Sequence, residues 1–166
     1  SFFSSPTVIS AAKNSNPTGG IRFVGEFKQN ETITAENNIS DSDGLGALSY
    51  KWFSDSVVIA GQNEKTLQLA QDLVGSKISL EISYVDKLGF EESIWSSNSD
   101  LVQNVNDAPV LESVATQSVV EGSYWSYQIG ASDPDSNDEL NFTLSSDFNW
   151  LEINKTSGLL FGIPTY

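Results

Sequence analysis

The chain of 166 residues contains no cysteine, no histidine and no methionine. Without cysteine it has no disulfide and no thiolate nucleophile, and without histidine it has neither the usual zinc ligands nor a Ser-His-Asp triad. The remaining route to hydrolysis, a pair of carboxyl groups flanking a cleft, needs a set separation that adjacent turn carboxylates do not provide. We therefore expect a protein that is not an enzyme.

Basic residues are also scarce. Eight lysines and arginines stand against 22 aspartates and glutamates, which gives a formal net charge of −14. Such a chain repels nucleic acid and anionic lipid surfaces, so neither is an expected partner. The same excess of carboxylates opposes compaction unless cations offset it, which makes a divalent cation an attractive hypothesis.

Long apolar runs are missing as well. No stretch approaches the length of a membrane-spanning helix, and the first residues do not form the basic and apolar regions of a signal peptide. If the protein is exported, its signal is expected to lie outside this sequence.

The sequence does contain short segments in which apolar and polar residues alternate. The clearest are residues 48–52 and 78–84, and a third, residues 21–24, ends at a glycine. Residues 66–69 predict a further strand followed by a turn. Several short strands separated by Gly, Asn, Asp and Ser predict an all-β protein built as antiparallel β-sandwiches.

The polar run from Asn104 to Pro109 predicts a domain boundary, because its proline blocks strand and helix continuation. Residues 1–104 match the size of one immunoglobulin-type sandwich. Residues 105–166 leave room for only four or five strands, so this module is expected to be truncated or completed by a strand from elsewhere. An open sheet edge would then be available for pairing.

Several motifs of the first module, in this order, resemble a repeat of large bacterial surface or secreted proteins of the RTX-adhesin type. They are Asn16-Pro17-Thr18-Gly19, Glu31-Thr32-Ile33-Thr34-Ala35, Asp41-Ser42-Asp43-Gly44-Leu45-Gly46, Ser49-Tyr50-Lys51-Trp52, and residues 72–78 and 83–89. The resemblance implies an immunoglobulin-like or cadherin-like sandwich, secreted or on the cell surface. Its expected partners are neighbouring repeat modules, with a cell-surface protein or polysaccharide as a further kind of partner.

The second module resembles a dystroglycan-type cadherin-like domain. The motifs are Val120-Glu121-Gly122, Ala131-Ser132-Asp133-Pro134-Asp135, Trp150-Leu151-Glu152-Ile153 and residues 156–164. That family continues past the last motif with further strands and a calcium-binding aspartate, which this chain does not include.

The run from Asn104 to Pro109 is similar to the Asp-x-Asn-Asp-Asn-x-Pro linker of cadherins, with Asn104 in place of the first aspartate and one residue fewer. Asp133 and Asp135 are two positions apart, so both carboxylates project to one side of an extended segment. Calcium prefers six to eight oxygen ligands drawn from several segments. The predicted ligands of an interdomain calcium ion are Glu31, Asn104, Asn106, Asp107, Asp133 and Asp135, with Glu31 included by the resemblance.

Two further groups of acids are predicted by the same resemblance. Asp41, Asp43 and Asp86 are expected at the other end of the first module, and Glu121 at the far end of the second. For all these motifs the alternative is turn chemistry alone, since Asp, Pro, Gly and Ser are the usual turn formers.

The aromatic residues separate two hypotheses. Trp52 lies on an alternating strand where immunoglobulin-like sandwiches bury a tryptophan, so it is predicted to be in the core. Five other aromatic residues could offer a sugar-stacking platform: Trp95, Tyr124, Trp125, Tyr127 and Trp150. The sequence thus predicts a calcium-rigidified spacer or adhesion segment, with a carbohydrate-binding module of a polysaccharide-degrading protein as the alternative.

Overall fold

The computed structural model describes residues 13–165. The chain divides into two compact units, Ser1–Val105 and Asn106–Tyr166, one residue from the predicted boundary. Apart from one short 3-10 turn, every regular element of the described residues is a β-strand, so the predicted all-β class is confirmed. None of the described residues forms a helix long and apolar enough to cross a membrane.

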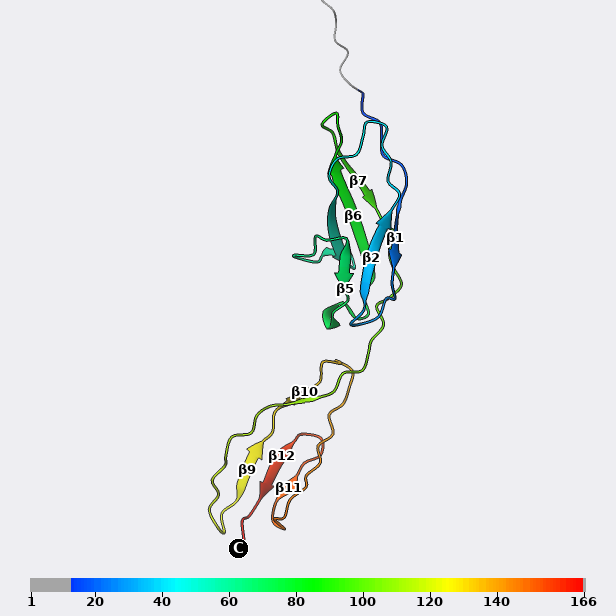
Figure 1. The fold of residues 1–166 in the computed structure, drawn as a ribbon. Helices are drawn as coiled ribbons and strands as arrows, with labels where there is room; N and C mark the ends of the chain where they lie inside the picture. The colour runs from blue at the N-terminus through cyan, green and yellow to red at the C-terminus, as the bar shows by residue number, and fades with distance from the viewer. Residues whose placement is uncertain (1–12, 166) are drawn as a thin grey trace, which may run out of the picture. The chain divides into compact units, whose positions relative to one another are not determined.

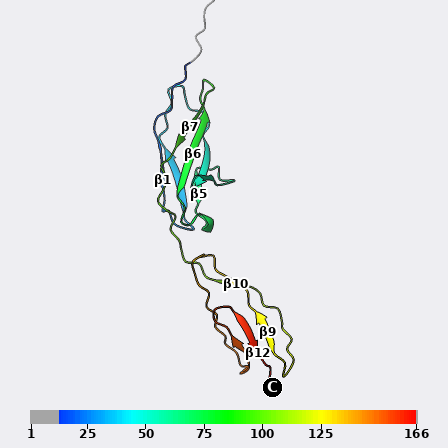
Figure 2. The same ribbon diagram turned by 180° about the vertical axis from the view of Figure 1, so that it is seen from behind.

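The first unit is a two-layer sandwich of antiparallel strands (Figures 1 and 2). One sheet has the order β1-β2-β5 and the other β4-β3-β6-β7. The elements are β1 (Ile21–Val24), β2 (Thr32–Asn37), β3 (Ser49–Ser54), β4 (Val57–Val58), β5 (Thr66–Gln68), the 3-10 turn η1 (Gln71–Leu73), β6 (Ile78–Val85) and β7 (Glu91–Trp95).

The core of the first unit follows from the alternation of apolar residues along its strands. In β6 the inward residues Ile78, Leu80 and Ile82 have no exposed surface. Trp52 of β3 is also fully buried, and its indole Nε1–H donates to the carbonyl oxygen of Glu64 at 2.8 Å. The predicted core position of Trp52 is therefore confirmed, with its one polar atom satisfied.

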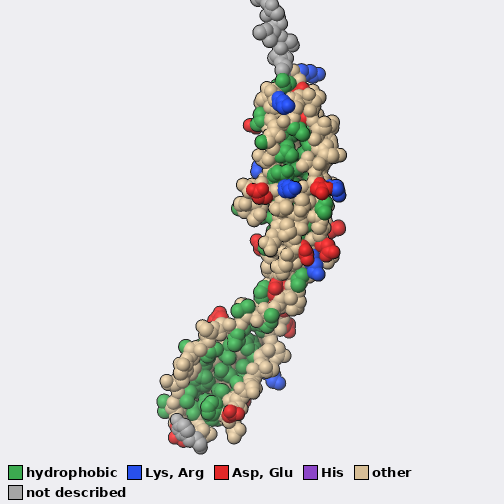
Figure 3. Space-filling model, in the orientation of Figure 1, with side chains coloured by type: hydrophobic (Ala, Val, Ile, Leu, Met, Phe, Trp, Pro, Cys, Tyr) green, Lys and Arg blue, Asp and Glu red, His purple; other side chains and the backbone are tan. Residues whose placement is uncertain are grey.

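The second unit has five short strands. They are β8 (Val110–Leu111), β9 (Trp125–Gln128), β10 (Ala131–Ser132), β11 (Glu152–Ile153) and β12 (Leu159–Gly162). They form one sheet of β10 and β8 and another with the order β11-β12-β9. No Ala, Val, Ile, Leu, Phe, Trp or Tyr side chain among residues 106–165 is buried, and Figure 3 shows many of these apolar side chains at the surface.

Candidate functional site

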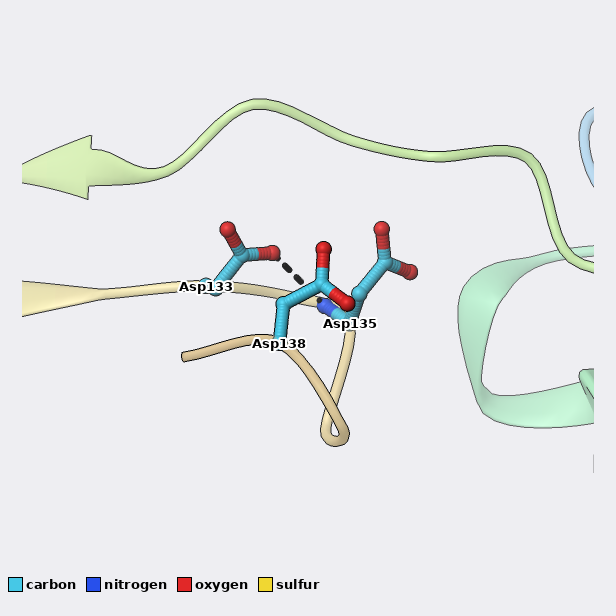
Figure 4. A group of neighbouring side chains, drawn as sticks. All are labelled: Asp133, Asp135 and Asp138. Carbon is cyan, nitrogen blue, oxygen red and sulfur yellow. Dashed lines mark hydrogen bonds between the residues drawn. The ribbon is translucent and has the colours of Figure 1, made fainter. Parts of the chain in front are cut away.

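The loop that follows β10 brings three carboxylates together (Figure 4). The carboxylate oxygens of Asp133, Asp135 and Asp138 lie within 4.8 Å of one another. The loop is held by its own backbone, because the N–H of Asp135 donates to Asp133 Oδ1 at 2.9 Å and the N–H of Asp138 donates to the carbonyl oxygen of Asp135 at 3.0 Å. Asp135 is only 5% exposed, whereas Asp138 is open to solvent.

The segment that begins the second unit is attached to this loop. The backbone N–H of Asp107 donates to Asp135 Oδ2 at 2.7 Å. A shallow hollow of about 320 Å³ lies beside the loop, and its lining includes Asn106, Asp107, Asp133 and Asp138. The start of the unit and the acidic loop therefore form one structural feature.

The donor set of this feature fits a hard divalent cation. Carboxylate and amide oxygens are the ligands that calcium prefers. No lysine or arginine lines the hollow, and Glu139 adds a further carboxylate to it. Carboxylates held this close repel one another, so a bound cation would stabilise the loop.

The structure brings together only part of the predicted interdomain set. Asn106, Asp107, Asp133 and Asp135 are gathered within the second unit, as described above. Glu31 and Asn104 are exposed residues of the first unit, and their part in binding an ion stays a prediction. Glu121 is exposed in the turn before β9 and stays a prediction too.

Asp138 is the residue that sequence reasoning missed. It lies five positions after Asp133 in a polar run that was interpreted only through its Asp-Pro-Asp motif. A turn folds the run back, so the third acid returns to the first two. The number of acids in this polar run was the sequence signal that could have revealed Asp138.

In the first unit, the loop that contains Asp41 and Asp43 has the same hydrogen-bonding pattern as the loop after β10. The N–H of Asp43 donates to Asp41 Oδ1 at 2.8 Å, and the N–H of Ser15 donates to Asp43 Oδ2 at 2.6 Å. Asp86 is buried in the turn between β6 and β7. Among the described residues, the only group of three acids within 4.8 Å is Asp133, Asp135 and Asp138, so a three-carboxylate site at Asp41, Asp43 and Asp86 stays a prediction.

These two loops share one hydrogen-bonding pattern at a constant shift along the chain. Three pairs of equivalent residues are each 92 positions apart: Ser15 and Asp107, Asp41 and Asp133, Asp43 and Asp135. The backbone pairing of Thr18 with Ser40 recurs, with the same shift, as that of Val110 with Ser132. The shift of 92 residues is a sequence signal that motif reasoning on each module separately did not use.

Tyr84, at the acidic end of the first unit, is expected to make the stability of this unit depend on pH in the alkaline range. Its hydroxyl donates to Asp41 Oδ2 at 2.7 Å. Burial raises the pKa of Tyr84, and the hydrogen bond to Asp41 and the charges of Asp41, Glu92 and Asp86 raise it further.

A raised pKa in the folded state means that the folded protein holds the phenolic proton more tightly than the unfolded chain. This contribution to stability is complete below pH 10, the ordinary tyrosine pKa, and is lost as the pH rises above it. In EDTA, the free energy of unfolding should fall between pH 9 and pH 11, and we expect Tyr84→Phe to make this fall smaller. Urea unfolding at each pH measures the free energy. Tyr124→Phe, at an exposed position, is the matched control, and equal effects of the two changes would contradict the prediction.

Comparison of the chain with family models, curated proteins and solved structures found no match. The resemblance to bacterial cadherin-like and immunoglobulin-like repeats therefore stays a prediction from motifs.

Proposed function

We propose that this chain is a non-enzymatic, extracellular pair of β-sandwich modules that acts as a spacer and binds calcium at the loop after β10. The observation that carries the proposal is the group of three carboxylates of Asp133, Asp135 and Asp138, whose oxygens lie within 4.8 Å. Their oxygen-only chemistry and the absence of basic residues from the adjoining hollow support calcium as the ligand.

Calcium at this loop would act on the polypeptide segment that joins the two units. Asp107 is already bonded to Asp135 through its backbone. An ion that neutralises the loop would strengthen this arrangement and restrict residues 106–109, of which all but the half-buried Asp107 are exposed. Calcium would thereby convert a flexible connection into a stiffer one, which is the property that a spacer needs.

The proposal predicts a calcium-dependent gain in stability of the second unit. A ligand that binds only the folded state adds about 2.7 kcal/mol when its free concentration is a hundred times its Kd. We expect calcium, and not magnesium at equal ionic strength, to slow hydrogen exchange at residues 131–142 relative to EDTA. Mass spectrometry of the exchanged peptides measures this effect.

Asp138→Asn is the sharpest variant for this test, because Asp138 is exposed and the change keeps its shape. It should abolish the calcium effect, while Asp147→Asn, an exposed acid of the same unit that is absent from the group, should keep it. Equal exchange in calcium and EDTA for the unmodified chain would refute calcium binding here.

One observation favours carbohydrate binding as a second candidate function. A cavity of about 340 Å³ in the second unit is lined in part by Trp125, Phe148 and Trp150. The rings of Trp125 and Trp150 meet edge to face with centroids 6.3 Å apart. Only Gln117 and Thr165 add polar side chains to the lining, whereas a sugar needs several hydrogen-bonding partners.

Titration with soluble polysaccharides, followed by tryptophan fluorescence, distinguishes the two functions. The spacer function predicts that the polysaccharides cause no saturable change in tryptophan fluorescence. A saturable change that Trp150→Ala removes, without loss of the fold by circular dichroism, would establish the carbohydrate-binding function instead.

A further inference from the structure

The second unit contains a segment with the pattern of a strand but without a strand partner. In residues 140–145 the apolar Leu140, Phe142 and Leu144 alternate with polar residues, which is typical of a strand with one buried face. None of these residues belongs to a strand. Among the described residues, the backbone of this segment makes one backbone hydrogen bond, from the N–H of Phe142 to the carbonyl oxygen of Lys155 at 2.7 Å.

The shift of 92 residues that relates the two acidic loops also relates this segment to β3. Residues 48–55 and 140–147 both begin with leucine and end with serine and aspartate. In the first unit, β3 is paired with β6 over its whole length. Trp52 is fully buried there, whereas its counterpart Leu144 is 36% exposed. The position that β6 covers in the first unit is therefore open in the second.

The backbone of the segment has the open edge that β3 uses for β6. At the end of β3, the N–H of Asp55 donates to the carbonyl oxygen of Lys77, just before β6. Amides two positions apart in an extended segment face the same side, and neighbouring amides face opposite sides. The equivalent amides of the second unit are those of Thr143 and Ser145, and the N–H of Phe142 is used on the other side. Thr143 and Ser145 thus present unpaired amides to an incoming strand.

The apolar side chains of the segment need a cover on the same edge. The ring of Phe142 lies over Gly158, just before β12, where an added Cβ would be 2.8 Å from it. Leu144 is on the same face of the segment but is exposed. In the first unit, the fully buried Leu80 and Ile82 of β6 lie opposite the equivalent positions of β3. A strand added in that register would cover Leu144 in the same way.

We propose that the second unit binds an extended polypeptide strand at residues 141–146, antiparallel and in the register of β3 with β6. The partner has the chemistry of β6, with apolar residues opposite Phe142 and Leu144 and polar residues between them. Main-chain hydrogen bonds give such strand addition its affinity, and the alternate side chains give its specificity. The inference goes beyond the proposed function, because it needs no calcium and uses none of the three clustered carboxylates.

A second copy of this chain is a poor donor of the strand. Its β6 has the required pattern but is already paired with β3 on one side and with β7 on the other. Freeing β6 would expose Ile78, Leu80 and Ile82, which have no exposed surface in the folded unit. The occupant is therefore a separate polypeptide with an unpaired strand of this pattern.

A synthetic peptide with the sequence of residues 76–86 is the probe, and the intact chain in EDTA is the target. The peptide should slow hydrogen exchange at residues 141–146 about tenfold when its free concentration is ten times its Kd. A control peptide with Ile78→Ser, Leu80→Ser and Ile82→Ser has the same backbone but no apolar face, and should have no effect. Because calcium is absent, failure of the proposed calcium site would leave this result unchanged.

Thr143→Pro in the intact chain removes one amide of the open edge and should abolish the slowing, whereas Thr143→Ala keeps the amide and should retain it. The two peptides, compared on the unmodified chain, keep the test decisive if the proline variant does not fold. Absence of slowing in the unmodified chain, or equal slowing by both peptides, would overturn the inference. Protection of residues 141–146 that appears without peptide and rises with the concentration of the chain would overturn it in favour of a second copy.

Discussion

Replacing Trp52 with alanine is expected to lower the free energy of unfolding of the first unit by about 3–5 kcal/mol. The side chain is fully buried between the two sheets, and its ring stacks on Phe23 with centroids 5.5 Å apart. The change removes these contacts, leaves a cavity and deprives the carbonyl of Glu64 of its hydrogen bond. Because a domain is stabilised by only about 5–15 kcal/mol, this loss is a large part of the total.

Urea unfolding, monitored by the hydrogen exchange of amides in β3 and β6, measures this loss. This probe does not rely on tryptophan fluorescence, which the substitution itself changes. The matched control is Trp95→Ala, because Trp95 is 52% exposed and its main aromatic contact is with Phe53. We expect the control to cost about 1 kcal/mol or less. Similar losses for the two tryptophans would show that Trp52 does not anchor the core.

The second unit is expected to exchange its amide hydrogens at least about a hundredfold faster than β6, a difference of about 2.8 kcal/mol in opening free energy. The reason is that no Ala, Val, Ile, Leu, Phe, Trp or Tyr side chain of residues 106–165 is buried, whereas those of Ile78, Leu80 and Ile82 are completely buried. A unit of about 60 residues buries too little surface to have stability to spare. Its strands of two to four residues add few backbone hydrogen bonds.

Hydrogen exchange of the intact chain in EDTA, resolved by peptide, measures the difference. Peptides that contain β9 and β12 are compared with those that contain β3 and β6. Protection of β9 equal to that of β6 would contradict the prediction and would imply that the second unit is covered in solution, for instance by a second copy. Dilution distinguishes that outcome, because protection by a second copy falls with concentration.

These two expectations predict how strongly calcium would affect the stability of each unit. The first unit has a core that stabilises it without a ligand, so its stability is expected to depend little on calcium. The second unit lacks such a core, so the same ion at the loop after β10 would be a large part of its stability. A spacer with this property would be sensitive to calcium in one unit far more than in the other.

Alternation along the chain predicted several strands correctly. Residues 48–52 and 78–84 correspond to β3 and β6, and the strand and turn expected after residue 66 are β5 and η1. Residues 21–24 form β1, which ends before Gly25, where φ is +125° and a Cβ would lie 2.9 Å from the carbonyl oxygen of Thr32. These features are local, which is why the sequence reveals them.

The acidic groups were predicted less completely. Asp133 and Asp135 were found because they are close in sequence and in a turn motif. The hydrogen bond from Asn14 to Glu92 was not predicted, because it joins residues 78 positions apart. The inward position of Glu92 follows from the pairing of β7 with β6, and the alternation within β7 alone does not show which face is buried.

The sequence by itself determined the all-β class, the core position of Trp52 and the excess of acids that makes a cation attractive. Composition and the period of two dictate these properties, since both act through neighbours in the chain. Only the tertiary structure decided which oxygens converge, that Asp138 joins Asp133 and Asp135, and that Asp86 is buried with one oxygen unpaired. Strand pairing and the folding back of loops fix the distances between groups far apart in sequence, and charge repulsion and burial depend on those distances.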